Sequence, residues 1–438
     1  MLQYEKITKS FSRGLYGNCF TVFGTLILAT SCQVAIAATA CVSQSGTCPY
    51  STIGAAVTGV AAGDTIQVQP GIYNESIVIT KSLSLIGAGR DRTIINAFGL
   101  PNGIFVDGTA KAPDAGISGV VISGLAVQNA NFEGILVANG TSITISANQV
   151  SGNNRSLNSA NGTCPGLPAF ETNEGMDCGE GIHLIAVNHS IVANNIVKNN
   201  SGGILITDET GATYNNLITG NTVSGNGYAC GITLASHPAS PTTSLKLPGG
   251  IHHNTISGNT STGNGLLLPG AGAGVGIFAP GPGNQNYSNV VVNNTLTGNG
   301  LPGVTMHNHA SFPMAPPVNM NDNMIIGNTI SGNAADGEDA ATPGPTGINL
   351  YSVAPVTGTV IAQNVIRNEQ VAVAVKIPSG DVRVQLNNLQ GPTGVDNLGS
   401  GTINAIQNYW GCAGGPGQSG CGGVIGTVIT SNFAVVPF

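Results

Sequence analysis

The chain has 438 residues, of which only 8% are charged, and a formal net charge of −7 at pH 7. Its 41% hydrophobic content excludes a disordered polar chain, and its acidic balance with scattered Lys and Arg excludes a nucleic-acid binder. The 64 glycines and the many short aliphatic runs favour short strands joined by tight turns.

Residues 1–37 have the pattern of a signal peptide. Lys6, Lys9 and Arg13 make a basic start, FTVFGTLILAT is apolar but too short to span a membrane, and Ala35-Ile36-Ala37 offers small residues for cleavage. We therefore expect export to the periplasm, the medium or the cell surface, and no membrane association once the peptide is removed. Residues 38–438 are expected to form a single domain, as a monomer.

Short Cys spacings in the exported part predict three loop disulfides, namely Cys41–Cys48, Cys164–Cys178 and Cys412–Cys421. Cys230 is left over, and a buried thiol is expected there. Zinc is disfavoured because no CxxC or clustered Cys/His spacing occurs.

The two ends of the domain carry capping signals. Ile53, Val57 and Val60 have helical spacing behind a Ser51 or Thr52 N-cap, so residues 38–63 are predicted to cover the N-terminal end. Residues 404–438 contain the only Trp, Trp410, and are predicted to close the C-terminal end.

Between these caps one repeat recurs at irregular spacing. LITGNTVSGN at 217–226 has relatives at 145–153, 191–200, 251–259, 290–299 and 325–333, and each holds two Asn five residues apart around an aliphatic residue. Taking the first Asn of each as a corner between two strands, we expect it to adopt the left-handed conformation and its amide to stack along a ladder. These corner residues are Asn148, Asn195, Asn221, Asn254, Asn294, Asn328 and Asn364.

A second motif, Gly-aliphatic-x-aliphatic, accompanies most repeats, as in GIHL at 181, GILI at 203, GITL at 231, GIFA at 276 and GINL at 347. Together the motifs describe three short strands per turn with aliphatic columns inside. The predicted fold is all-β, a parallel β-helix of about ten coils with an N-terminal helix cap.

DTIQVQPGIYNESIVITKSLSLIGAG at 64–89 resembles the opening of right-handed parallel β-helix proteins of the pectin-lyase-like superfamily, and NYWGCAGGPG at 408–417 resembles a closing segment of secreted β-helix repeat proteins. The resemblance implies right-handed coiling. It also implies a polysaccharide partner along the sheet that carries the second motif.

The long insertions flank that same sheet. Residues 154–180, 260–275 and 334–346 precede its strands, while residues 235–250, 280–289 and 307–322 follow them, which predicts a floor between two walls. Alternation predicts the substrate-binding floor as His183, Thr233, Phe278, Asn349 and Tyr351. Asp208, Glu209, His237 and His307 are the candidate catalytic acid and base residues.

The superfamily's polygalacturonase, methylesterase and epimerase signatures are missing from this floor, and Lys246 and Lys376 are the only basic residues near it, which disfavours a polyuronate. Two metals are considered. The acidic stretch ETNEGMDCGE at 171–180 could hold Ca²⁺, although its spacing matches no defined loop, and His307, His309 and Met314 could hold copper.

Three hypotheses follow. The first is a non-catalytic polysaccharide-binding or surface-structural protein. The second is a carbohydrate-active enzyme of the glycoside hydrolase or lyase type, and the third is a periplasmic copper-binding protein.

Overall fold

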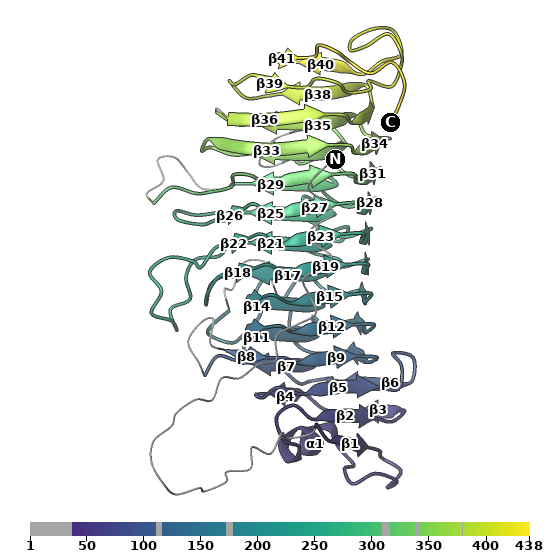
Figure 1. Cartoon of the computed structure of the whole chain (residues 1–438), viewed down its shortest axis with the longest axis vertical. Coiled ribbons are helices and arrows are strands. Elements are labelled where there is room, and N and C mark those ends of the chain that lie inside the picture. Colours follow the sequence, from purple (N-terminus) through teal and green to yellow (C-terminus); the bar gives the residue numbers. More distant parts are fainter. Residues whose placement is uncertain (1–36, 111–115, 172–177, 309–315, 338–341, 379) are drawn as a thin grey trace, which may run out of the picture. The chain divides into compact units, whose positions relative to one another are not determined.

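The computed structural model describes residues 37–438 except 111–115, 172–177, 309–315, 338–341 and 379. Within these residues three parallel sheets wind around one core, and successive coils stack from β1 at one end to β41 at the other (Figure 1). The parallel β-helix is therefore confirmed.

Sheet A, with fourteen strands, and sheet B, with eleven, meet at the corner made by the first Asn motif. The strands of sheet A are β1 (Thr39–Val42), β2 (Thr65–Val68), β5 (Ser84–Gly87), β9 (Val121–Ser123), β12 (Thr144–Ser146), β15 (Ile191–Ala193), β19 (Leu217–Thr219), β23 (Thr255–Ser257), β27 (Val290–Val292), β30 (Met324–Ile326), β33 (Val356–Ala362), β36 (Gly380–Gln385), β39 (Ile403–Asn404) and β41 (Val428–Ile429). Those of sheet B are β3 (Gly71–Tyr73), β6 (Thr93–Asn96), β10 (Ala126–Gln128), β13 (Gln149–Ser151), β16 (Ile196–Lys198), β20 (Thr222–Ser224), β24 (Thr260–Thr262), β28 (Thr295–Thr297), β31 (Thr329–Ser331), β34 (Val365–Arg367) and β37 (Asn388–Gln390).

Sheet C, with sixteen strands, contains the Gly-aliphatic motif. Its strands are β4 (Ile77–Ile79), β7 (Ile104–Asp107), β8 (Ile117–Ser118), β11 (Ile135–Thr141), β14 (Ile182–Asn188), β17 (Ile204–Thr207), β18 (Thr213–Tyr214), β21 (Ile232–Ala235), β22 (Ile251–His252), β25 (Val275–Phe278), β26 (Asn286–Tyr287), β29 (Val304–His307), β32 (Thr346–Tyr351), β35 (Val371–Lys376), β38 (Thr393–Asn397) and β40 (Gly423–Ile425). The capping regions add strands that the repeat motif does not mark, so sheet A extends beyond the expected ten coils.

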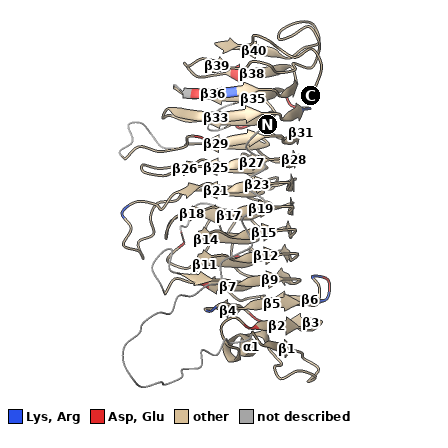
Figure 2. Ribbon diagram, viewed as in Figure 1, with Lys and Arg blue, Asp and Glu red and all other residues tan. Residues whose placement is uncertain are grey.

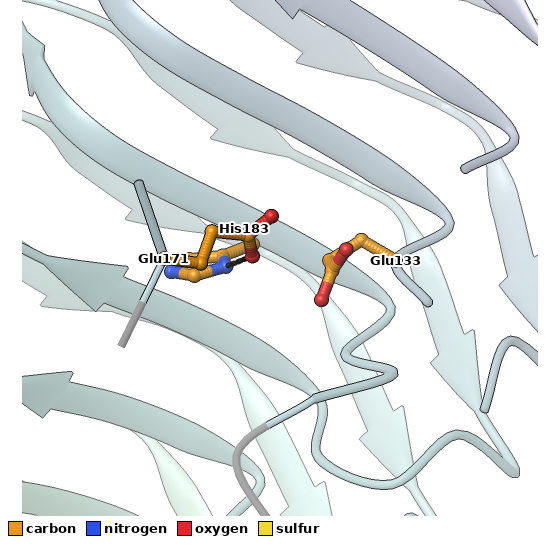
Figure 3. Close-up of side chains that lie close together, drawn as sticks. All are labelled: Glu133, Glu171 and His183. Atoms are coloured by element: carbon orange, nitrogen blue, oxygen red, sulfur yellow. Dashed lines mark ion pairs between the residues drawn. The ribbon is translucent and has the colours of Figure 1, made fainter. Parts of the chain in front are cut away.

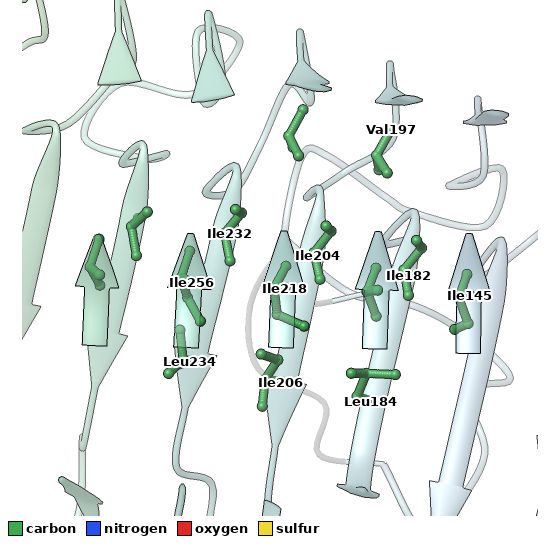
Figure 4. Packing of buried hydrophobic residues seen from close by; sticks show 14 of the residues in the cluster. Ile145, Ile182, Leu184, Val197, Ile204, Ile206, Ile218, Ile232, Leu234 and Ile256 are labelled. Carbon is green, nitrogen blue, oxygen red and sulfur yellow. The ribbon is translucent and has the colours of Figure 1, made fainter. Parts of the chain in front are cut away.

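The aliphatic columns form the core. Ile145, Ile218 and Ile256 from sheet A and Ile182 and Ile204 from sheet C stack in register, and each is fully buried (Figure 4). Through the central coils this packing repeats from one coil to the next, so columns of aliphatic side chains fill the interior there.

The N-terminal helix cap is confirmed. Helix α1 (Ile53–Gly59) begins at the Thr52 cap, whose hydroxyl accepts the Ala55 N–H at 3.3 Å, and Glu75 accepts the Ile53 and Gly54 N–H groups at 3.0 and 2.9 Å. At the other end the Trp410 side chain is fully buried in the core cluster. Across the described part of the chain, no helix has the length and apolar character that crossing a membrane requires.

The Asn motif forms three amide ladders, and their assignment corrects two expectations. The ladder at the A–B corner passes through Asn259, whereas Asn254 belongs to a different ladder, which precedes sheet A. The left-handed residue is not the ladder Asn but the one before it, as in Gly220 (φ 63°) before Asn221. The ladders run through Asn148, Asn195, Asn221, Asn259, Asn294, Asn328, Asn364, Asn387 and Asn408; through Asn153, Asn200, Asn226, Asn264, Asn299, Asn333 and Glu369; and through Asn216, Asn254, Asn289 and Asn323.

The left-handed corner predicts a small and specific effect of substitution at Gly258 (φ 62°), where an added Cβ would meet no atom within 4 Å. We expect Gly258→Val to lower the free energy of unfolding by about 1–2 kcal/mol, because a branched residue is strained in this conformation. Gly258→Asn should cost less than half of that, since Asn194 and Asn293 adopt the same conformation at equivalent corners. Denaturant unfolding of both variants checks the difference, and equal losses would contradict it.

Glu369 ends the second ladder and predicts a pH dependence of stability. Its Oε1 accepts the Asn333 N–H and Nδ2–H at 3.0 Å each, and burial raises its pKa from an ordinary 4.5 to about 7 despite these bonds. A folded-state pKa above the unfolded value means that the contribution to stability is present below pH 4.5 and lost as the pH rises through 7.

Glu369→Gln keeps the acceptor and removes the titration. The variant should match the parent chain near pH ~4 and exceed its stability near pH ~8 by at most about 3 kcal/mol. Thermal melts at both pH values measure this, and a difference that does not change with pH would show that Glu369 does not titrate in this way.

Candidate functional site

The outward face of sheet C is covered rather than open. On this face of the coil, side chains would ordinarily contact water, yet Leu136, Leu205, Thr305 and Asn349 are at most 1% exposed. The flanking loops therefore pack onto the floor. Charged residues are sparse over most of the coils (Figure 2), so each buried acid on this face stands out.

Asp208 follows β17 and holds one wall in place. Its carboxylate accepts the Ser236 hydroxyl, the His237 N–H and the Gly250 N–H, each at 2.8 Å. Burial raises the pKa of Asp208 to about 7, although these donors oppose the increase. The geometry makes Asp208 the anchor of segment 236–250, whereas the sequence suggested a catalytic acid or base.

Glu209 and His237 form a buried acid–imidazole pair. The Nδ1 atom of His237 lies 3.8 Å from Oε1 of Glu209, and the two side chains are 1% and 0% exposed. Burial alone would raise the pKa of Glu209, but the hydrogen bond and electrostatic effect of the His237 imidazole, the electrostatic effect of His183 and the Thr207 hydroxyl outweigh it and lower the pKa to about 2. Glu209 is therefore ionised and able to orient the imidazole.

His183, on the neighbouring coil, is connected to Glu209 through the Thr207 hydroxyl. Its Nε2 lies 3.0 Å from the Thr207 hydroxyl, and its Nδ1 lies 3.4 Å from Oε2 of Glu171. Glu171 comes from the loop closed by the Cys164–Cys178 disulfide, and Glu133 lies two residues before β11. Figure 3 shows Glu171 against the His183 ring, with Glu133 on the adjacent coil. Burial, and then the Glu171 charge, raise the pKa of Glu133 to about 8.

His307 lies apart from this group and makes a second one. Its Nε2 is 2.8 Å from Oδ2 of Asp336 and 3.0 Å from Nδ2 of Asn349, which itself donates to Asp336 at 2.9 Å. The Phe278 ring contacts His307 edge-on, with ring centroids 5.8 Å apart. The four proposed catalytic residues therefore do not converge, since His307 pairs with Asp336 three strands away from β17 along sheet C.

The substrate-binding prediction for Phe278 has the wrong register. Val275 pairs with Ile232 and Phe278 pairs with Ala235, so the repeat begins at Gly274 and the GIFA match at 276 is displaced by two residues. Phe278 consequently stands in the column of His307 and Tyr351 rather than beside Thr233. Thr233, Phe278 and Tyr351 are half-buried, and Lys376 lies 5.5 Å above the Tyr351 ring.

The copper hypothesis loses part of its basis. Met306 and Met320 are core residues, each 1% exposed, and His307 belongs to the pair with Asp336. His309 and Met314 lie outside the described residues. Among the residues that are described, the one cluster of three or more potential ligands is Glu133, Glu171 and His183.

Several site residues escape sequence reasoning. Glu133, Asp336 and Thr207 come from other coils than the imidazoles they contact, so spacing along the chain gives no signal for them. All three predicted disulfides are present, and Cys230 is a buried thiol whose sulfur accepts the Ala273 N–H at 3.2 Å.

A row of rings at the edge of sheet C was also not predicted. Tyr214, His252 and Tyr287 stack face to face on successive coils with centroids 5.1 and 5.0 Å apart, and Nδ1 of His252 lies 3.0 Å from Nδ1 of His253. Because the ring faces cover one another, the row stabilises the stack of coils and offers little free ring surface to a sugar.

Comparisons with known proteins agree with this architecture. Residues 90–247 match the family model described as "Right handed beta helix region". No curated protein sequence matches the chain significantly. The tailspike protein gp208 of Dettilon has a similar structure, with a TM-score of 0.51 and 12% identity over 84% of this chain and 62% of the tailspike.

Two further solved structures are similar. ORF18 of Geobacillus virus E2 has a TM-score of 0.50 and 13% identity over 80% of this chain and 56% of its own. The DFA-IIIase of Arthrobacter chlorophenolicus A6 without its lid has a TM-score of 0.50 and 13% identity over 85% of this chain and 89% of the DFA-IIIase. At these identities the likeness concerns the fold, and the right-handed parallel β-helix that the resemblance implied is confirmed.

Proposed function

We propose that this right-handed parallel β-helix protein is exported and acts on a polysaccharide, with Glu209 and His237 as its proton-transfer pair. The observation that carries the proposal is the set of acid–imidazole pairs buried on the outward face of sheet C. The fold requires no charge there, because uncharged residues such as Leu136, Leu205 and Thr305 fill the same covered face. Removing ionisable pairs from water costs free energy, and such arrangements are concentrated at sites of proton transfer.

The chemistry suits glycosidic bonds. An ionised carboxylate beside Nδ1 holds the imidazole in one orientation and leaves Nε2 to give or take a proton. The stacked, equivalent strands of sheet C offer repeated positions along one direction, which suits a polymer of repeating units. Three disulfides support an oxidising, extracytoplasmic location.

Substrate access requires movement of a wall. His237 is 1% exposed and lies in segment 236–250, which Asp208 fastens through three hydrogen bonds. Displacement of this segment would open the floor to a sugar chain, as active-site loops do in many enzymes.

The same burial favours a second candidate, a non-catalytic polysaccharide-binding or surface-structural protein, in which the pairs only fasten the walls. A panel of neutral and acidic polysaccharides separates the two candidates. Release of new reducing ends or unsaturated products, together with binding, supports the enzyme. Saturable binding with no product supports the binding protein, and neither binding nor product contradicts both.

A further inference from the structure

We propose that Glu133, Glu171 and His183 bind a divalent transition-metal ion, for which Zn²⁺ is the best-suited candidate. The proposal does not depend on the activity of the chain. One potential ligand atom from each residue lies within 4.8 Å of the other two, and all three residues are buried (Figure 3).

Glu133 supplies the first argument. It is 0% exposed, its Oε1 accepts a long 3.4 Å hydrogen bond from the Gly179 N–H, and its Oε2 has no hydrogen-bond partner in the described part of the chain. A buried carboxylate oxygen without a donor is costly, and more so beside a second carboxylate. A bound cation would remove both costs.

The tautomer of His183 also indicates a bound cation. The Thr207 hydroxyl bonds to Glu209, and an ionised carboxylate can only accept, so the hydroxyl proton is committed to Glu209. Thr207 must then accept from Nε2–H of His183 at 3.0 Å, which leaves the lone pair of a neutral imidazole on Nδ1, directed at Glu171. Two acceptors that face one another need a proton or a metal ion between them.

The spacing and the ligand set indicate the class of ion. Ligands about 2.0–2.2 Å from Zn²⁺ in a tetrahedron lie about 3.4 Å apart, and Nδ1 of His183 lies 3.4 Å from Oε2 of Glu171. One imidazole and two carboxylates leave a fourth position open for water. Ca²⁺ takes about six to eight oxygen ligands, so a nitrogen in the set disfavours it.

The surroundings resemble a prepared site. Thr207 fixes the ring of His183 from behind, which is the usual arrangement around a metal-bound imidazole. Glu171 also lines a surface cavity of about 320 Å³ formed by residues 163–169, so one of the three ligands borders space that solvent can enter. The Cys164–Cys178 disulfide holds the loop that delivers Glu171.

The test uses the full exported chain, stripped with a chelator and titrated with Zn²⁺, with metal content measured after gel filtration. We expect one ion per chain and a higher melting temperature. Glu133→Gln and His183→Ala should each weaken binding more than about 100-fold, beyond the 10–100-fold expected for the outer-shell variant Thr207→Val. In chelator, Glu133→Gln should melt no lower than the parent chain, which shows that the loss is not due to misfolding.

His253→Ala is the matched control, because it removes an imidazole that contacts His252 at an exposed position, outside the cluster of Glu133, Glu171 and His183. This variant should retain the stoichiometric ion. Loss of the ion in His253→Ala but not in His183→Ala would overturn the proposal. So would a stoichiometric preference for Ca²⁺ over Zn²⁺, or the absence of binding by the stripped parent chain.

Discussion

Replacing His237 by Ala is expected to reduce kcat/KM on a cleaved polysaccharide about 10²–10⁴-fold, the usual contribution of a positioned general acid or base. The fold should survive the change. The hydrogen bond that fastens segment 236–250 to Asp208 at this position comes from the backbone N–H of residue 237, and Ala keeps it. A loss of activity without a loss of melting temperature is therefore the expected combination.

Glu209→Gln tests the role of the carboxylate. It preserves shape and removes the charge 3.8 Å from Nδ1 of His237, so activity should fall and the acidic limb of the pH–rate profile should move to lower pH. Thr222→Ala, an exposed position on sheet B, is the control and should keep full activity. If His237→Ala retained more than about a tenth of the activity, Glu209 and His237 would not be the proton-transfer pair.

Replacing Asn259 by Leu is expected to lower the free energy of unfolding by about 3–5 kcal/mol, since it leaves several buried polar groups unpaired. Oδ1 of Asn259 accepts the N–H and the Nδ2–H of Asn221, and its Nδ2 donates to Ile218 O and to Asn294 Oδ1, all at 2.9–3.0 Å. Asn259 is 1% exposed, so water cannot replace these bonds.

Asn199→Gly provides the comparison. Asn199 has φ 56° and an exposed side chain, and Gly adopts this conformation without strain. The free energy of unfolding of this variant should therefore differ from that of the parent chain by less than about 0.5 kcal/mol. Urea unfolding of both variants measures the contrast. Equal effects would mean that the buried ladder amides contribute no more than a surface Asn does.

Two motif positions were predicted in the wrong register because the sequence pattern fits the chain at two places. GVGIFA at 274–279 contains two glycines that each fit the start of the Gly-aliphatic motif, and the match at Gly276 is the wrong one. Likewise Asn254, Asn259 and Asn264 are spaced five apart, so the motif fits that coil in two ways. Only strand pairing decides between such alternatives, because both satisfy the local alternation of apolar residues.

The candidate site was less predictable than the fold. Sequence reasoning named His183, Glu209 and His237 from their positions after or within the strands of sheet C. It could not pair them with Glu133, Glu171 or Thr207, or His307 with Asp336, because those contacts join different coils or a loop to a coil. For Asp208, which the sequence suggested as a catalytic residue, only the structure revealed the three hydrogen bonds that fasten segment 236–250.

The sequence by itself determined the parallel β-helix and its aliphatic columns, which follow from a local period that the coils repeat, and the N-terminal helix cap and the disulfides, which follow from short local spacings. The tertiary structure alone decided which acid meets which imidazole and which outward residues are covered. Those contacts depend on how irregular loops fold back over sheet C, and no repeated spacing encodes the path of an irregular loop.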